Sequence, residues 1–162
     1  MPPRKTSFDE LDFEIIRALR GDARLPAADI ARRTGSNERT VRKRIDRLVA
    51  DGVVRLTAIL DPLAFGYLTA ADIFLEAEPA AETAVLDTLM AMPAVTYVAF
   101  GQGSNEISIE ARFKDNDALR EFLRKTLPAI PGVTVTRYAL VPRILRNIDE
   151  WMPAREDFHL PE

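Results

Sequence analysis

The apolar residues of this chain recur at two different spacings, and the change between them divides the sequence into two parts. From residue 8 to residue 48, apolar side chains recur every three or four positions, which predicts three short helices at 8–20, 27–34 and 37–48. Beyond residue 69, stretches with alternating apolar residues surround two further helical stretches. A helical part followed by a mixed part is therefore expected.

The third predicted helix, residues 37–48, combines an apolar stripe with a basic surface. The stripe consists of Val41, Ile45 and Leu48. Asn37 is suited to the N-cap because its side-chain oxygen can accept a free N–H of the first turn. Gly52 follows the last apolar position, where helices often need a left-handed residue. A short amphipathic helix with one basic surface is expected, and a merely solvated surface helix is the alternative.

The residues before this helix make it part of a larger motif. For the first helix, Ser7 is the expected N-cap, with Glu10 completing a capping box. Pro26 opens the second helix, because its missing N–H is not needed in a first turn. Gly35 and Ser36 then form a tight turn into the third helix. Two helices joined by such a turn form a helix-turn-helix.

Residues 53–60 form a β-type run, which predicts a strand and hence a winged helix-turn-helix over residues 1–60.

Charge separates the same two parts. Residues 1–60 carry 13 Lys and Arg against 9 Asp and Glu, whereas residues 61–162 carry 9 against 16. The net charge of −3 thus hides a basic module joined to an acidic one, which suggests two different tasks.

The second part reads as β-α-β-β-α-β. After a linker at 61–68, the predicted strands are 69–77, 95–100, 107–113 and 133–141, and the predicted helices are 80–92 and 116–127. This order is typical of a ferredoxin-like α+β sandwich with both helices on one face of an antiparallel sheet. That domain is expected over residues 69–142, and residues 143–162 are expected to form a C-terminal tail.

Several motifs resemble those of the Lrp/AsnC family of prokaryotic transcription regulators. They are Gly-Asp-Ala-Arg-Leu-Pro at 21–26, Asp-Ile-Ala-Arg-Arg-Thr-Gly at 29–35, Thr-Val-Arg-Lys-Arg-Ile-Asp-Arg-Leu at 40–48, Leu-Asp-Pro-Leu-Ala-Phe-Gly at 60–66, Met-Pro-Ala-Val at 92–95 and Ile-Pro-Gly-Val at 130–133. The resemblance covers residues 8–145. It implies a sequence-specific DNA-binding regulator, acting in the cytoplasm, whose second domain mediates oligomerisation and senses an effector such as an amino acid.

Double-stranded DNA is the first partner expected. A helix fits the major groove, where side chains near its N-terminus reach base edges, while other basic side chains hold phosphates. The candidate DNA-binding residues are Arg32, Arg33, Asn37, Arg39, Thr40, Arg42, Lys43 and Arg47. Arg39, Arg42 and Lys43 are expected on the outer face of the helix. Arg44 is placed near the buried side by its spacing, and both a structural and a DNA-binding role remain open for it.

The effector-binding residues follow from the resemblance. They are Gly101, Gln102, Gly103, Ser104, Asn105, Glu106, Thr136 and Tyr138. The family's glycine loop has Asp where this chain has Glu106, and the last strand has Thr136-Arg137-Tyr138 in place of Thr-x-Thr. A plain hairpin is the alternative for the loop. A ligand-independent architectural DNA binder is accordingly the alternative function.

Enzyme chemistry has little support in the residues present. The chain has no Cys and a single His, His159, so neither a metal site of His and Cys nor a catalytic triad is expected, and no cofactor is implied. A tetrapyrrole decarboxylase-like enzyme, found among relatives with this layout, is the remaining enzyme alternative. Neither a signal peptide nor a membrane span is expected.

A second copy of the chain is the other expected partner. The predicted strands supply more apolar residues than one face of a sheet should hold: Ile73, Leu75, Val98, Phe100, Ile107, Ile109 and Val135. Pairing of two sheets would bury the surplus and make a homodimer, the commonest symmetric assembly. Trp151 in the tail is a further candidate for an interface, with ordinary core packing as the alternative.

Overall fold

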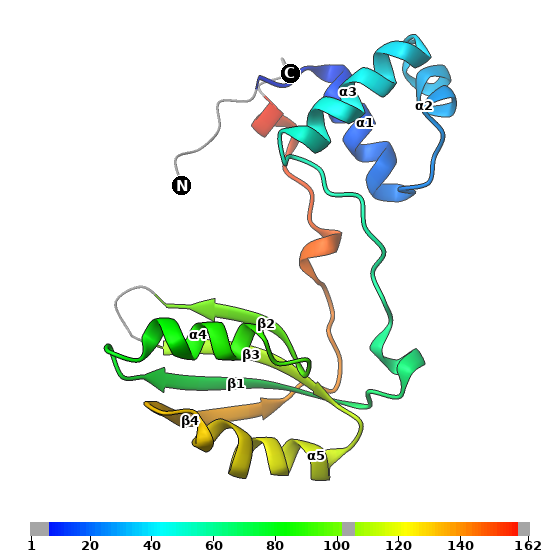
Figure 1. The fold of residues 1–162 in the computed structure, drawn as a ribbon. Helices are drawn as coiled ribbons and strands as arrows, with labels where there is room; N and C mark the ends of the chain where they lie inside the picture. Colours follow the sequence, from blue (N-terminus) through cyan, green and yellow to red (C-terminus); the bar gives the residue numbers. More distant parts are fainter. Residues whose placement is uncertain (1–6, 102–105, 159–162) are drawn as a thin grey trace. The chain divides into compact units, whose positions relative to one another are not determined.

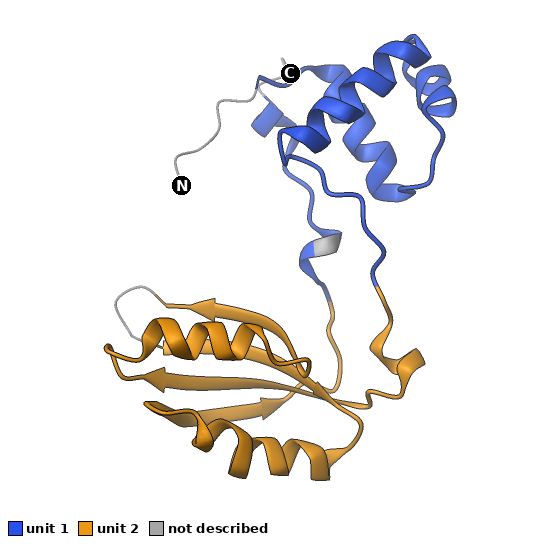
Figure 2. Ribbon diagram, viewed as in Figure 1, with its two compact units in different colours: residues 1–59, 146–162 blue, residues 60–145 orange. Residues whose placement is uncertain are grey.

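The computed structural model describes residues 7–101 and 106–158 of the chain (Figure 1). These residues form two compact units, residues 1–59 with 146–162 and residues 60–145 (Figure 2). The end of the chain thus belongs to the first unit, although it follows the second in sequence. In the described ranges, no helix has both the length and the apolar character needed to cross a membrane.

The first unit contains the three expected helices. They are α1 (Glu10–Gly21), α2 (Ala27–Thr34) and α3 (Glu38–Ala50), and its C-terminal segment adds the 3-10 turns η4 (Ile148–Glu150) and η5 (Arg155–Phe158). The apolar stripes of the helices meet in one core of buried residues: Ile15, Leu19, Ala27, Ile30, Ala31, Val41 and Leu48. Gly35 adopts a left-handed φ of 64° between α2 and α3, which confirms the helix-turn-helix.

The cap of α1 differs from the expectation. Asp9, and not Ser7, is the N-cap: its Oδ1 accepts a hydrogen bond from the Asp12 N–H at 3.0 Å, and its own N–H donates to Asp12 Oδ2 at 3.2 Å. A carboxylate at each end completes the capping box two residues later than predicted. The expected cap of α3 is confirmed, because Asn37 Oδ1 accepts from the Arg39 N–H at 2.8 Å.

The strand expected at residues 53–60 is not formed. The N–H groups of Val53 and Val54 bond back to the Leu48 carbonyl at the end of α3. Beyond them the backbone has no strand partner in the described part of the chain, and a single extended segment cannot satisfy its own backbone groups. The β-propensity of the run was real, but a strand also needs a neighbour.

The second unit confirms the ferredoxin-like fold. It consists of η1 (Pro62–Phe65), β1 (Thr69–Ala77), α4 (Glu82–Met90), β2 (Val95–Phe100), β3 (Glu106–Phe113), α5 (Asn116–Glu121), the π-helix η2 (Phe122–Thr126), the 3-10 turn η3 (Leu127–Ala129) and β4 (Val133–Leu140). The strands pair antiparallel in the order β2-β3-β1-β4, which makes β4 an edge strand. Residues of α4 and α5 share one core with the strands.

The apolar strand residues do not form a surplus. Ile73, Leu75, Ile107 and Ile109 are buried in the core shared with the helices, and Val98 and Val135 pack against the same core. Strand alternation turns their neighbours to the other face, which is mostly polar: Asp72, Phe74, Ser108, Glu110 and Arg112. The expectation of a second apolar face was therefore wrong for six of the seven residues, which fit on one face, while Phe100 is 42% exposed and lies outside this core.

Candidate nucleic-acid interface and effector site

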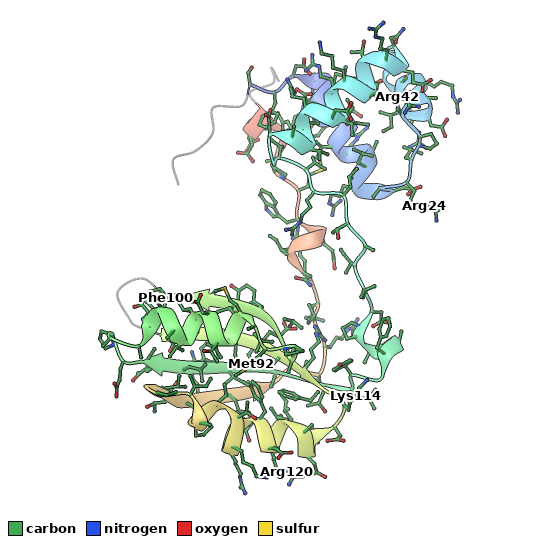
Figure 3. The ribbon with its side chains drawn as sticks, viewed as in Figure 1. Arg24, Arg42, Met92, Phe100, Lys114 and Arg120 are labelled. Carbon is green, nitrogen blue, oxygen red and sulfur yellow. The ribbon has the colours of Figure 1, made fainter. Side chains whose placement is uncertain are left out.

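The outer face of α3 is basic, as expected. Val41 and Leu48 are buried on one side of the helix, while Arg39, Arg42 and Lys43 are exposed to solvent. Figure 3 labels Arg42 on α3, where its side chain is 66% exposed. Its guanidinium pairs with Glu38 at 2.6 Å, but both side chains are exposed, and such surface pairs contribute little and open readily.

The other proposed contacts lie around the same helix-turn-helix. Arg33 is exposed in the last turn of α2 and has no ion pair among the described residues, while Arg32 pairs with Asp29 at 2.7 Å. Asn37 and Thr40 are exposed in the first turn of α3. These side chains and the outer face of α3 lie within residues 32–43, one short stretch of chain.

Two arginines of α3 point inward, toward α1. Asp12 of α1 is fully buried, and its Oδ2 accepts from Arg44 Nη1 at 3.0 Å and from Arg47 Nη2 at 2.6 Å. Arg44 also pairs with Asp9 at 2.7 Å. Of the two roles left open for Arg44, these ion pairs favour the structural one. Arg47 was predicted to contact a DNA phosphate, but its guanidinium also pairs with Asp12.

The cluster of Asp9, Asp12, Arg44 and Arg47 is tightly constrained. Asp12 Oδ1 and Arg47 Nε are buried and have no hydrogen-bond partner in the described structure, which costs stability and persists only where the surrounding contacts leave no alternative. Burial alone raises the pKa of Asp9, but the Asp12 N–H and the Arg44 guanidinium more than offset this and lower it. Burial likewise lowers the pKa of Arg44, while the two carboxylates raise it. The ion pairs of Arg44 and Arg47 with Asp9 and Asp12 therefore hold α3 against α1.

The sequence analysis did not identify Asp12 as the partner of the α3 arginines, although the apolar pattern of α1 contains a sign of it. Asp12, Ile15 and Leu19 lie at helical spacing and share the buried face of α1. A carboxylate within an apolar stripe requires a partner, because an unpaired buried charge is strongly unfavourable. That stripe and the inward position of Arg44 together predict a pair, but the sequence alone does not say that the two faces meet.

The glycine loop is only partly described. Gln102, Gly103, Ser104 and Asn105 lie outside the described residues. At the loop's ends, the Gly101 N–H donates to the Glu106 carbonyl at 2.8 Å, which closes a hairpin. The Glu106 carboxylate lies 3.7 Å from Arg137 Nη2 on β4. The Arg137 guanidinium in turn stacks over the Phe74 ring, 3.4 Å from its centroid.

Thr136 and Tyr138 line a hollow at the edge of the sheet. The Thr136 hydroxyl donates to the Phe74 carbonyl at 3.1 Å, where the pairing of β1 and β4 shifts register. The hollow measures about 620 Å³ and is lined by Arg120, Leu123, Arg124, Val135, Thr136, Arg137 and Tyr138. Arg120 points outward from α5 in Figure 3. Arg137 therefore links this hollow to Glu106, and its role was not expected from sequence.

Two family profiles match the chain. A winged helix-turn-helix DNA-binding domain matches residues 8–55, which contain α1, α2 and α3. The Lrp/AsnC ligand binding domain matches residues 71–147, which run from within β1 to beyond β4. The two matches cover the two parts that the hydrophobic pattern separates.

Similar proteins extend over almost the whole chain. A helix-turn-helix-type transcriptional regulator of Pyrococcus horikoshii is 34% identical over 153 residues, which make up 94% of this chain and 94% of that protein. The transcriptional regulator FL11 of the same organism is 32% identical over 147 residues, covering 90% of this chain and 97% of that protein.

Solved structures share the architecture. Escherichia coli AsnC matches with a TM-score of 0.78 and 26% identity, covering 87% of this chain and 97% of that chain. A transcriptional regulator of Neisseria meningitidis, solved as a complex with L-Met, matches with a TM-score of 0.83 and 20% identity, covering 91% and 97%. The latter similarity concerns the fold.

Proposed function

Because the chain belongs to the Lrp/AsnC family of transcriptional regulators, we propose that it binds specific DNA sequences through α3 and adjusts this binding to a small effector held by its sheet unit. Its relatives are regulators and it is not an enzyme. The observation that carries the proposal is the division of the α3 arginines: Arg44 and Arg47 anchor the helix inward, which leaves Arg39, Arg42 and Lys43 outward.

The proposed contacts have separate roles. Arg39, Arg42 and Lys43, together with Asn37 and Thr40, lie where the N-terminal half of a recognition helix meets base edges. Arg32 and Arg33 would hold phosphates, which add affinity without sequence preference. Arg47 contributes mainly by positioning α3. The chain would act in the cytoplasm as a homodimer, whose two copies of α3 reach two half-sites about one helical turn apart.

The DNA-binding proposal is tested with a duplex selected from a random library and a scrambled duplex of the same composition. We expect Arg42→Ala to lose about 1–3 kcal/mol on the selected duplex and to relax base choice at one position. The matched control is Arg120→Ala, because Arg120 is equally exposed and pairs with Asp117 at 2.6 Å in the other unit. Equal losses in both variants, or no binding by the wild type at low salt, would contradict the proposal.

For the effector, we propose a site that includes Glu106, the loop from Gly101 to Asn105, and Thr136 and Tyr138. An ionised Glu106 accepts hydrogen bonds and would suit a ligand ammonium group. Arg137, which already pairs with it, would have to share it. Calorimetry with a panel of amino acids should therefore give a ligand whose binding is lost in Glu106→Ala and kept in Glu110→Ala, the next carboxylate along the same face of β3.

The architectural alternative has one observation in its favour, the ion pair of Glu106 with Arg137 at 3.7 Å. A carboxylate that is held in a structural ion pair needs no ligand. A regulator that responds to an effector must bind it with different affinity in two states, so binding must change DNA affinity or assembly. If calorimetry detects binding of none of the amino acids while the protein still binds DNA, the architectural function is favoured.

A further inference from the structure

The C-terminal segment, residues 146–158, packs on the helical unit (Figure 2). Near its end, Phe158 is only 3% exposed. Its ring lies 5.3 Å from that of Phe8 and 5.1 Å from that of Phe13 on α1, the second pair meeting edge to face. Terminal segments usually fray unless they are tied down, so a buried aromatic ring at this position indicates a docked segment.

Polar contacts hold the same segment along the length of α1. Both guanidinium Nη atoms of Arg155 donate to the carboxylate of Glu10 in the first turn of α1, at 2.8 and 2.5 Å. Arg155 also lies over the Phe13 ring, 5.4 Å from its centroid. At the last turn of α1, Arg20 donates to the Glu150 carbonyl. Paired, planar contacts of this kind fix orientation as well as position.

The C-terminal segment and the recognition helix hold different faces of α1. Asp12, Ile15 and Leu19 share the face that enters the core and binds the arginines of α3. Glu10 and Phe13 lie on another face, which the C-terminal segment covers. If the C-terminal segment displaces α1, the position of α3 therefore changes as well, and the reverse also holds, because a packed helix moves as a rigid element.

We propose that Phe158 and Arg155 are positioning residues for DNA reading. They fix α1 from one side, and α1 fixes α3 from the other side through the ion pairs of Asp12. Residues 141–145 join the segment covalently to β4, so the sheet unit is connected to the helical unit by this path as well as by residues 53–68. The consequence for DNA rests on the proposed function, whereas the docking itself does not.

The docking is tested by amide hydrogen exchange on the full chain without DNA. We expect Phe158→Ala to speed exchange in α1 and α3 about tenfold or more, since loss of packing makes local opening easier. Phe158→Leu, which refills part of the space, should restore most of the protection. Trp151→Ala is the matched control, because Trp151 lies in the same segment, is 57% exposed, and has no ring contact among the described residues. Similar exchange in the Phe158→Ala and Trp151→Ala variants would overturn the docking.

The positioning role is tested by the ratio of affinities for the selected and the scrambled duplex. Phe158→Ala should lower this ratio about fivefold or more and leave the salt dependence unchanged, because no phosphate contact is removed. If exchange rises in α1 while α3 and the affinity ratio stay as in the wild type, the segment only covers α1 and the positioning role is wrong. If the wild type binds no DNA, the proposed function and the positioning role for DNA both fail, and hydrogen exchange in α1 and α3 still decides the docking.

Discussion

At the residue scale, Asp12 is the buried side chain that joins α1 to α3. It is fully buried, it completes the capping box of α1, and it binds two arginines of α3. Removing one partner of a buried ion pair leaves the other charges without compensation, which is worse than removing the whole pair. The geometry of α3 therefore rests on a buried residue that is not part of the proposed DNA-binding surface.

A substitution at Asp12 gives a direct test. We expect Asp12→Asn to lower the free energy of unfolding of the helical unit by about 2 kcal/mol or more, somewhat less than a fully buried pair because both arginines are partly exposed. Chemical denaturation followed by circular dichroism measures the change. Asp117→Asn serves as control, since that carboxylate is 86% exposed and its pair should contribute about 0–1 kcal/mol. A loss in the control as large as at Asp12 would contradict this account.

At the element scale, α1 is the helix that the other elements of its unit share. Its first turn carries Asp9, which caps it and pairs with Arg44 of α3. Because these contacts lower the pKa of Asp9, its charged form stabilises the fold. That contribution is present above the ordinary Asp value of 3.8 and is lost as the pH falls through the lowered pKa. Acid should therefore loosen the contact between α1 and α3.

The variant Asp9→Asn isolates this effect, because Asn caps a helix as well as Asp does but does not titrate. We expect thermal unfolding scans below about pH 4 to show a smaller acid-induced loss of stability in the variant than in the wild type. Above that pH the wild type should be the more stable of the two. Parallel stability curves across the whole range would show that the charge of Asp9 has no such role.

At the scale of the whole molecule, the connecting segment carries the longest run of exposed apolar residues, whereas the sheet exposes only its edge-strand residues Tyr97, Phe100, Tyr138 and Leu140 among the described residues. Residues 53–68 expose large apolar side chains: Leu56, Ile59, Leu60, Leu63, Phe65 and Leu68. The open face of the sheet, where a second copy was expected to pack on apolar residues, carries mostly polar ones. Contiguous exposed apolar surface usually marks an interaction site, so a second copy is better placed to cover this segment.

We expect light scattering at micromolar concentration to give at least twice the monomer mass of 18.1 kDa. Ile59→Glu should shift the protein toward the monomer, because it would bury a charge in the interface. Met90→Glu, at a residue of α4 with similar exposure, should leave the mass unchanged. A monomeric wild type would contradict the homodimer, and equal effects of the two variants would place the interface elsewhere.

The sequence by itself determined the elements and the fold of both units. Apolar spacing located α1, α2, α3 and all four strands to within a few residues, and capping chemistry placed Asn37 at the start of α3. These features are local, because helix and strand periodicities depend on side chains a few positions apart. The family motifs identified a transcriptional regulator of the Lrp/AsnC type, whereas effector sensing and specific DNA binding stay predictions.

The tertiary structure decided what depends on residues far apart in sequence. The inward role of Arg44 and Arg47 depends on Asp12, 32 and 35 residues away, and the docking of the C-terminal segment depends on Glu10, 145 residues from Arg155. The run at residues 53–60 failed as a strand for the same reason, since a strand needs a partner that local pattern cannot supply. A sequence states what each face of an element prefers, and only packing decides which faces meet.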